Sequence, residues 1–265
     1  MDKAGKEYWN HTWADGVLPR PVDPSLMGLD NLMRRRYHQY FVDLFGKYDT
    51  KFMRILEVGC AKSSWLPYFS KQFEFEIVGL DYSPIGCEMA EKVLIKSGVK
   101  GCVVCADFFE PPLGMLGTFD FVVSFGVVEH FEDTTACVTA VSAFLKPGGI
   151  IITIIPNMAG CIGMVQKMVN RPVYDIHQII DSKMLRKGHE HAGLEVLKCH
   201  YFMSTHFGVC NLNGVSKNNI GWFLKKTLLG VLTRLSKMVW LLEEKIGMFH
   251  SGKMASPYVV CVSRK

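Results

Sequence analysis

Long uncharged apolar runs are missing from this 265-residue sequence, and no stretch approaches the roughly 20 apolar residues that a transmembrane helix needs. The first residues, MDKAGKEYW, are polar and lack the apolar segment of a signal peptide. Basic residues are not gathered into the stripe that nucleic-acid binders carry, and the formal net charge is only +5. We therefore expect a cytoplasmic protein that does not bind nucleic acid.

Paired cysteine patterns are also scarce, although the chain has 9 cysteines. Only Cys102 and Cys105 form a C-x-x-C pattern, which falls inside an apolar, strand-like run. A zinc site would need further ligands at matching spacing, and the sequence offers none. We expect buried free thiols, which suit a reducing compartment.

Short apolar runs alternate with helix-like segments from Lys51 onward. We predict strands over residues 52–59, 75–81, 102–107, 119–126, 150–155, 194–202 and 256–264. We predict helices over residues 63–73, 83–98, 134–149 and 179–192, and a helical stretch around 158–168. This alternation predicts an α/β fold with a mostly parallel sheet and helices on both faces.

The turn after the first predicted strand lacks glycines that a dinucleotide-binding turn would have. In RILEVGCAKSSW (residues 54–65), Gly59 is followed by Ala61 and Ser63 where two further glycines would stand. Those glycines line the path of a pyrophosphate in a dinucleotide site. The turn therefore favours a ligand without a diphosphate.

Three carboxylates fall near the ends of the first three predicted strands: Glu57, Asp81 and Asp107. Ligands of parallel sheets bind beyond the carboxyl ends of the strands, so these residues indicate one site. Carboxylates after the second and third strands suit a ribose and an adenine amino group. Glu57 would favour a cation. S-adenosylmethionine (SAM) has an adenosine, a positive centre and no phosphate.

Five segments resemble those of class I SAM-dependent methyltransferases, in the order and spacing of that family. They are LEVGCAKS, VGLDYSP, CADFFEPP, FDFVVSFGVVEHFED and LKPGGIIITIIPN. The resemblance covers roughly residues 50–202 and the final strand, and it is strongest to the small-molecule group that includes quinone-biosynthesis enzymes. It implies a Rossmann-like, seven-stranded sheet with an antiparallel final strand.

The resemblance also implies which residues hold SAM. Gly59 and Cys60 would contact its methionine part, Asp81 and Tyr82 its ribose and adenine, and the segment from Phe125 its sulfonium. With Glu57, the expected cofactor residues of the core are Gly59, Cys60, Asp81, Tyr82, Asp107, Phe108 and Phe125.

The segment SFGVVEHFED lacks the Asn-Pro-Pro-Tyr type of signature found where exocyclic amines are methylated, and the sequence lacks the aspartate cluster of magnesium-dependent catechol enzymes. We therefore expect a metal-independent enzyme. His130 is the first candidate for a general base, and its alternative is a structural histidine at a helix start. Glu129, His177 and His206 are further candidates.

Two regions lie outside the resemblance to the core. Residues 1–50 are helical and aromatic-rich, and in related enzymes such segments close over the cofactor. Trp13 and Tyr37 would then touch SAM; the alternative is that they anchor the segment to the sheet. The arginines 34–36 are expected on an exposed face of this segment.

The second region, residues 203–255, contains a long helical pattern before the final strand. Its apolar positions recur at helical spacing: Leu224, Leu228, Val231, Leu235, Met238, Leu242 and Ile246. Residues 221–247 could cover the substrate pocket, form a homodimer interface or lie on a membrane surface. The sequence leaves these three interpretations open.

We thus predict a lid (residues 1–50), a SAM-binding core (51–202), a helical insertion (203–255) and the last strand of the core (256–265). The predicted reaction moves a methyl group from SAM to a small, fairly apolar molecule, with oxygen favoured over nitrogen, sulfur and carbon, and leaves S-adenosylhomocysteine (SAH). The alternatives are an RNA or protein methyltransferase of the same fold, or a non-catalytic relative acting through the long helix.

Overall fold

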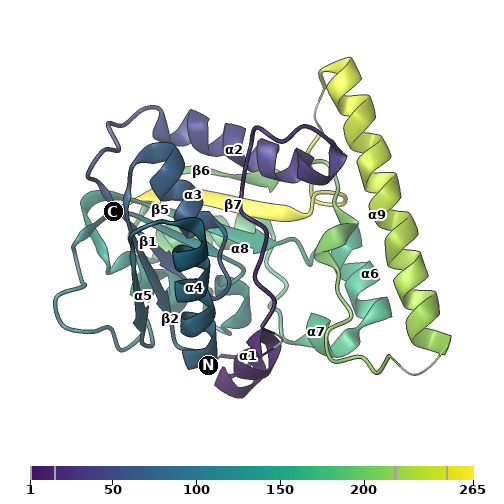
Figure 1. Cartoon of the computed structure of the whole chain (residues 1–265), viewed down its shortest axis with the longest axis horizontal. Helices are drawn as coiled ribbons and strands as arrows, with labels where there is room; N and C mark the ends of the chain where they lie inside the picture. Colours follow the sequence, from purple (N-terminus) through teal and green to yellow (C-terminus); the bar gives the residue numbers. More distant parts are fainter. Residues whose placement is uncertain (1, 15, 218–219, 249) are drawn as a thin grey trace.

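Seven strands form a mixed sheet in the computed structural model, which describes residues 2–14, 16–217, 220–248 and 250–265 (Figure 1). The strands are β1 (Arg54–Val58), β2 (Glu76–Asp81), β3 (Cys102–Cys105), β4 (Phe119–Phe125), β5 (Leu145–Pro156), β6 (Glu195–Phe202) and β7 (Tyr258–Arg264). Their order is β3-β2-β1-β4-β5-β7-β6, and β7 runs antiparallel to both of its neighbours. The predicted sheet with its antiparallel final strand is confirmed.

Nine α-helices and three short 3-10 helices are found in these described ranges. The α-helices are α1 (Lys6–Trp13), α2 (Leu32–Phe45), α3 (Trp65–Phe73), α4 (Pro84–Ser97), α5 (Thr134–Ser142), α6 (Cys161–Val169), α7 (Arg171–Asp175), α8 (Ser182–His191) and α9 (Ile220–Ile246). The 3-10 helices are η1 (Leu29–Asn31), η2 (Val128–His130) and η3 (Phe207–Val209). No helix in the part that the structure describes is both long and apolar enough to cross a membrane.

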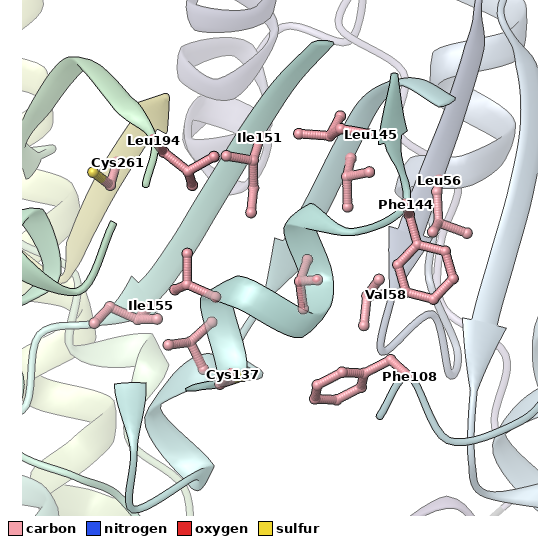
Figure 2. Packing of buried hydrophobic residues seen from close by; sticks show 14 of the residues in the cluster. Leu56, Val58, Phe108, Cys137, Phe144, Leu145, Ile151, Ile155, Leu194 and Cys261 are labelled. Atoms are coloured by element: carbon pink, nitrogen blue, oxygen red, sulfur yellow. The ribbon is translucent and has the colours of Figure 1, made fainter. Parts of the chain in front are cut away.

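Strand side chains alternate between two hydrophobic clusters, one on each face of the sheet. In β5, Ile152 and Ile154 join the cluster covered by α2, α3 and α4, whereas Ile151 and Ile155 join the one covered by α5 and α8. Figure 2 shows this second cluster, in which Cys137 of α5 lies over the sheet. The predicted helical layers on both faces are confirmed.

The two helices of the N-terminal region have different neighbours, and the predicted lid over residues 1–50 stays a prediction. Tyr37, Phe41 and Phe45 of α2 are buried in the hydrophobic core over the sheet. This supports the alternative that aromatic residues anchor the segment. By contrast, α1 lies beside α4, at the carboxyl end of β2 (Figure 1).

The predicted helix over 134–149 is too long. α5 ends at Ser142, and β5 already begins at Leu145, which is fully buried and pairs with Phe119 of β4. Burial of Leu145 in the sheet outweighs the helical pattern. The pairing shifts register between Phe119 and Phe121, and Pro147 is tolerated in the strand beside this irregularity.

All nine cysteines are free, but two are exposed rather than buried as expected. Cys102 and Cys105 are exposed because β3 is an edge strand of the sheet. Cys161 and Cys199 are partly buried, and the other five are buried.

α9 lies along one side of the molecule, beside α6 and away from the sheet (Figure 1). Its buried residues are Ser236, Trp240 and Glu243. The predicted apolar positions face outward: Leu224, Leu228, Val231, Leu235, Met238, Leu242 and Ile246 are all at least 36% exposed. We call these seven residues the outer stripe.

The arginines of α2 are partly buried rather than exposed, because α9 packs near them. Arg35 pairs with Glu244 and Arg36 with Glu243, each at 3.2 Å. The pair with Arg36 explains why Glu243 of α9 is buried against the protein while the apolar stripe is exposed.

Candidate active site

The turn after β1 brings the chain close to the segment after β4. Gly59 has a φ of +75°, and a Cβ built on it would lie 2.4 Å from Cγ2 of Val127. Only glycine fits this approach without a shift. Lys62, rather than Ala61 or Ser63, is the other residue of this turn with positive φ, so the two missing glycines are not required by the backbone. The Lys62 amino group lies over the Trp13 ring.

Asp81, at the end of β2, is buried and holds the turn. Its Oδ2 accepts a hydrogen bond from the amide of Ala61 (3.1 Å), and its Oδ1 accepts one from the amide of Ser83 (2.8 Å). Burial raises the pKa of Asp81, and these backbone hydrogen bonds partly offset that effect. Each carboxylate oxygen keeps a lone pair that can accept a further hydrogen bond.

Glu57 is almost fully buried, and Ser63 is its partner. The Ser63 hydroxyl donates to Oε2 of Glu57 at 2.7 Å, so this departure from glycine has a function in the structure. Burial raises the pKa of Glu57 to about 8; the Ser63 hydrogen bond lowers it and the nearby Asp81 charge raises it. A cationic ligand would favour the ionised form of this carboxyl.

These residues line a cavity of about 270 Å³, which we call the first cavity. Trp9 and Trp13 of α1 stack with ring centroids 5.7 Å apart, and both line it, as do Tyr82 and Phe108. The Tyr82 hydroxyl donates a hydrogen bond to Asp2. The first cavity is thus bounded by buried carboxylates on one side and by aromatic rings on another.

The structure brings most of the predicted cofactor residues to the first cavity. Trp13, Glu57, Gly59, Asp81, Tyr82, Phe108 and Phe125 line it. Three others do not. The Cys60 side chain is buried beneath the turn, where its Sγ packs toward Gly79. Asp107 is exposed and accepts a hydrogen bond from the amide of Phe109. Tyr37 lines a second cavity instead.

The second cavity has a volume of about 340 Å³ and adjoins the first. Trp65, Phe125, Gly126 and His130 line both cavities, and we call them the shared rim. Trp65 and Phe125 stack with centroids 5.5 Å apart. The rest of the second cavity is largely apolar, with Met33, Ile154, Met158 and Tyr258 among its lining residues.

Glu129, His130 and His177 form the polar part of the second cavity. Each offers one ligand or hydrogen-bonding atom within 4.8 Å of the other two. Burial raises the pKa of Glu129 to about 8. Burial also lowers the pKa of His130 to about 3, with a further contribution from His177, and burial lowers the pKa of His177. Both rings are therefore neutral at neutral pH.

His206, the fourth predicted base, is not brought to this cluster. Its ring packs 5.0 Å from that of Trp240, and it lines neither cavity. Sequence reasoning missed Trp9, Trp65 and Ser63 as site residues. The sequence could have predicted Trp9, because it stands four residues before Trp13 and shares a helix face with it. No sequence pattern could have predicted Met158 and Tyr258, since tertiary packing alone brings them to the second cavity.

The first cavity fits SAM in three respects. Asp81 retains acceptor capacity for ribose hydroxyls, and Glu57 offers a carboxyl to a cation. The aromatic side chains provide surfaces for an adenine ring.

Comparisons with known proteins agree with this geometry. A family model described as "Methyltransferase domain" matches residues 30–199. A ubiquinone biosynthesis O-methyltransferase from Methylocella silvestris is 24% identical over 157 residues, which are 57% of this chain and 59% of that protein. The match therefore spans less than two thirds of this relative.

Two solved structures share the fold over nearly their whole length. Geranyl diphosphate C-methyltransferase from Streptomyces coelicolor has a TM-score of 0.58 at 12% identity, covering 98% of this chain and 96% of its own. The 4+2 cyclase SpnF has a TM-score of 0.63 at 14% identity, covering 100% and 96%. The chain belongs to the methyltransferase-domain family and has the fold of class I methyltransferases.

Proposed function

We propose that this protein transfers the methyl group of SAM to a hydroxyl oxygen of a small, largely apolar molecule held in the second cavity. The observation that carries this proposal is the shared rim. Trp65, Phe125, Gly126 and His130 line both cavities, so a donor in the first and an acceptor in the second would meet beside them. Methyl transfer needs mainly this alignment of donor and acceptor.

The composition of the second cavity supports an apolar acceptor with one reactive polar group. Met33, Ile154, Met158 and Tyr258 would contact the apolar part. Glu129, His130 and His177 would lie at the reactive end. Oxygen is favoured because a hydroxyl must lose its proton on methylation, and this cluster can assist that loss. The O-methyltransferase name of the Methylocella relative supports the same acceptor atom.

SAM, when bound, supplies a methyl carbon attached to a positively charged sulfur. Asp81 and Glu57 would hold the donor, and the shared rim would align it with the acceptor. The acceptor oxygen would form the new C–O bond while its proton passes to the cluster of Glu129, His130 and His177, and the electrons of the broken C–S bond would stay on sulfur. Loss of the positive charge in the product would remove the charge that favours ionised Glu57.

Transfer of isotopically labelled methyl from SAM to a cell extract, followed by mass spectrometry, tests this proposal. We expect label in an apolar small molecule with the wild type, and strongly reduced label with Asp81→Asn at the same low SAM concentration. Asp49→Asn is the matched control, because this exposed aspartate precedes β1 at the opposite edge of the sheet. Label in RNA or protein would instead support a macromolecular methyltransferase. Binding of SAM without any label would support a non-catalytic relative.

We further propose that α9 rests on an anionic membrane surface through its outer stripe. The stripe is apolar and exposed along the helix, and Arg234 and Lys245 are exposed on the same helix. The acidic residues Glu243 and Glu244 are paired with arginines of α2. The exposed charge beside the stripe is therefore positive, which complements anionic headgroups.

Vesicle co-sedimentation tests this surface. We expect binding to vesicles containing a third phosphatidylserine, weaker binding to phosphatidylcholine alone, and loss of binding in Leu228→Glu/Leu235→Glu. Leu113→Glu is the control, because Leu113 is a fully exposed leucine remote in sequence from α9. Failure of the wild type to sediment would contradict the proposal, and a concentration-dependent dimer that the double variant abolishes would assign the stripe to a second copy.

A further inference from the structure

We propose that Glu129, His130 and His177 bind one divalent transition-metal cation beside the shared rim, with an open coordination position toward the acceptor. This inference deepens the proposed function and rests on it for the role of the acceptor, but the cation site stands on the geometry of these three side chains. It departs from the metal-independent enzyme that the sequence predicts.

The two histidines each present a free nitrogen. The Nδ1–H of His130 donates to the carbonyl oxygen of Ile176 (3.2 Å), and the Nδ1–H of His177 donates to that of Val173 (2.6 Å). A carbonyl oxygen can only accept, so these bonds fix the tautomer and leave a lone pair on Nε2 of each ring. Metal-binding histidines are commonly oriented by such a bond.

The third ligand is a carboxyl with nothing to bind. Glu129 is 1% exposed, and neither of its carboxyl oxygens has a hydrogen-bond partner among the described residues. Its Oε1 lies 3.7 Å from Nε2 of His130. A buried polar group without a partner is costly, and a cation would satisfy this one.

Backbone hydrogen bonds hold the segments that carry the three ligands together. The amide of Gln178 donates to the carbonyl oxygen of Glu129 at 2.6 Å, which ties the segment after α7 to η2. The amide of Lys3 donates to the carbonyl oxygen of His130 (2.8 Å), and its Nζ donates to that of His177 (2.9 Å). The ligands come from distant parts of the sequence but are positioned before any cation binds.

Two imidazoles and one carboxylate favour zinc or a similar transition metal over magnesium, which prefers oxygen ligands. Three protein ligands leave a position for a substrate oxygen. The cation would act as a Lewis acid without change of oxidation state. The acceptor hydroxyl would bind it and release its proton to solvent, the oxygen would form the C–O bond, and the C–S electrons would stay on sulfur.

Zn²⁺ titration by calorimetry, with Co²⁺ absorption spectroscopy as a second readout, tests the site without any acceptor. We expect one Zn²⁺ per chain and visible Co²⁺ bands typical of nitrogen ligands. Glu129→Gln and His177→Ala should each weaken Zn²⁺ binding at least about tenfold. His200→Gln is the matched control, because His200 is a partly buried histidine that packs against Tyr40 and lines neither cavity.

Absence of saturable Zn²⁺ binding by folded wild type would overturn the inference, and so would equal binding by the cluster variants. SAH titration of the same samples separates the two proposals and confirms that each variant is folded. SAH binding and methyl transfer without Zn²⁺ binding would contradict the cation site but not the proposed function. Zn²⁺ binding without methyl transfer would support the cation site and contradict the proposed function.

Discussion

The two cavities of this protein are built in different ways. The first lies at the carboxyl ends of β1, β2 and β4, and each strand contributes its own turn: Gly59, Asp81 and Phe125. The second collects residues from segments with no common pattern, such as Met33 of α2, His177 after α7 and Tyr258 of β7. A parallel sheet dictates the first site, whereas the packing of variable segments dictates the second.

We expect the largest effect from Asp81→Asn, which should weaken binding in the first cavity and leave the second unchanged. Asp81→Asn removes a charged acceptor, and hydrogen bonds to charged groups are worth about 1.5–3 kcal/mol, or roughly 10- to 150-fold in affinity. SAH affinity, measured by calorimetry, should fall by that factor. The Zn²⁺ affinity of the second cavity should not change, and a fall in both would show that the cavities are not independent.

A substitution in the second cavity should leave the first cavity unchanged. Val209→Trp places an indole among its lining residues, so we expect methyl transfer to fall more than about tenfold through a higher KM for the acceptor. SAH affinity should stay within about twofold, because Val209 does not line the first cavity. Equal loss of SAH affinity would mean that the variant disturbs the shared rim.

A third comparison concerns the turn of the first cavity. Gly59→Ala combines a positive φ with a contact to Val127, and we expect it to lower the free energy of unfolding by about 1–3 kcal/mol. Ala61→Gly, at the position of a missing glycine, should change stability by less than about 1 kcal/mol. Denaturant unfolding of both variants measures the difference. Equal effects would contradict the assigned role of Gly59.

The smallest expected effect is the pH dependence of SAM binding through Glu57. Its pKa of about 8 lies above the ordinary value of 4.5, so the free folded protein holds this proton at neutral pH. A cationic ligand favours the ionised form, so affinity should rise from pH 6 to 8 by less than about tenfold in all, and level off above pH 8. By the same linkage, the stability of the free protein falls as pH rises between these two pKa values. Glu57→Gln should flatten both profiles, and an unchanged slope would exclude Glu57 as the cause.

Sequence patterns predicted the sheet and most of the first cavity because both depend on residues that are close together in the sequence. Alternating residues of β5 and the turn at Gly59 are set by their neighbours in the chain. Ser63 shows the limit of this reasoning: it counts as a departure from the family turn, yet its hydroxyl binds Glu57 across the turn.

Helical periodicity predicted the faces of α2 and α9 but not what each face contacts. α2 buries Phe41 in the core, whereas α9 exposes Leu235 and buries Glu243. Which face of each helix is buried depends on partners remote in sequence. Glu243, for example, is buried because it forms an ion pair with Arg36 of α2. The same remoteness explains why the sequence could not place His177 beside Glu129.

A crystal structure of the protein with SAH bound would show whether the donor and acceptor meet beside the shared rim. We predict that the ribose lies on Asp81 and that the sulfur lies beside Phe125 and Gly126, facing the second cavity. SAH bound with its sulfur directed away from the shared rim, or outside the first cavity, would contradict this prediction.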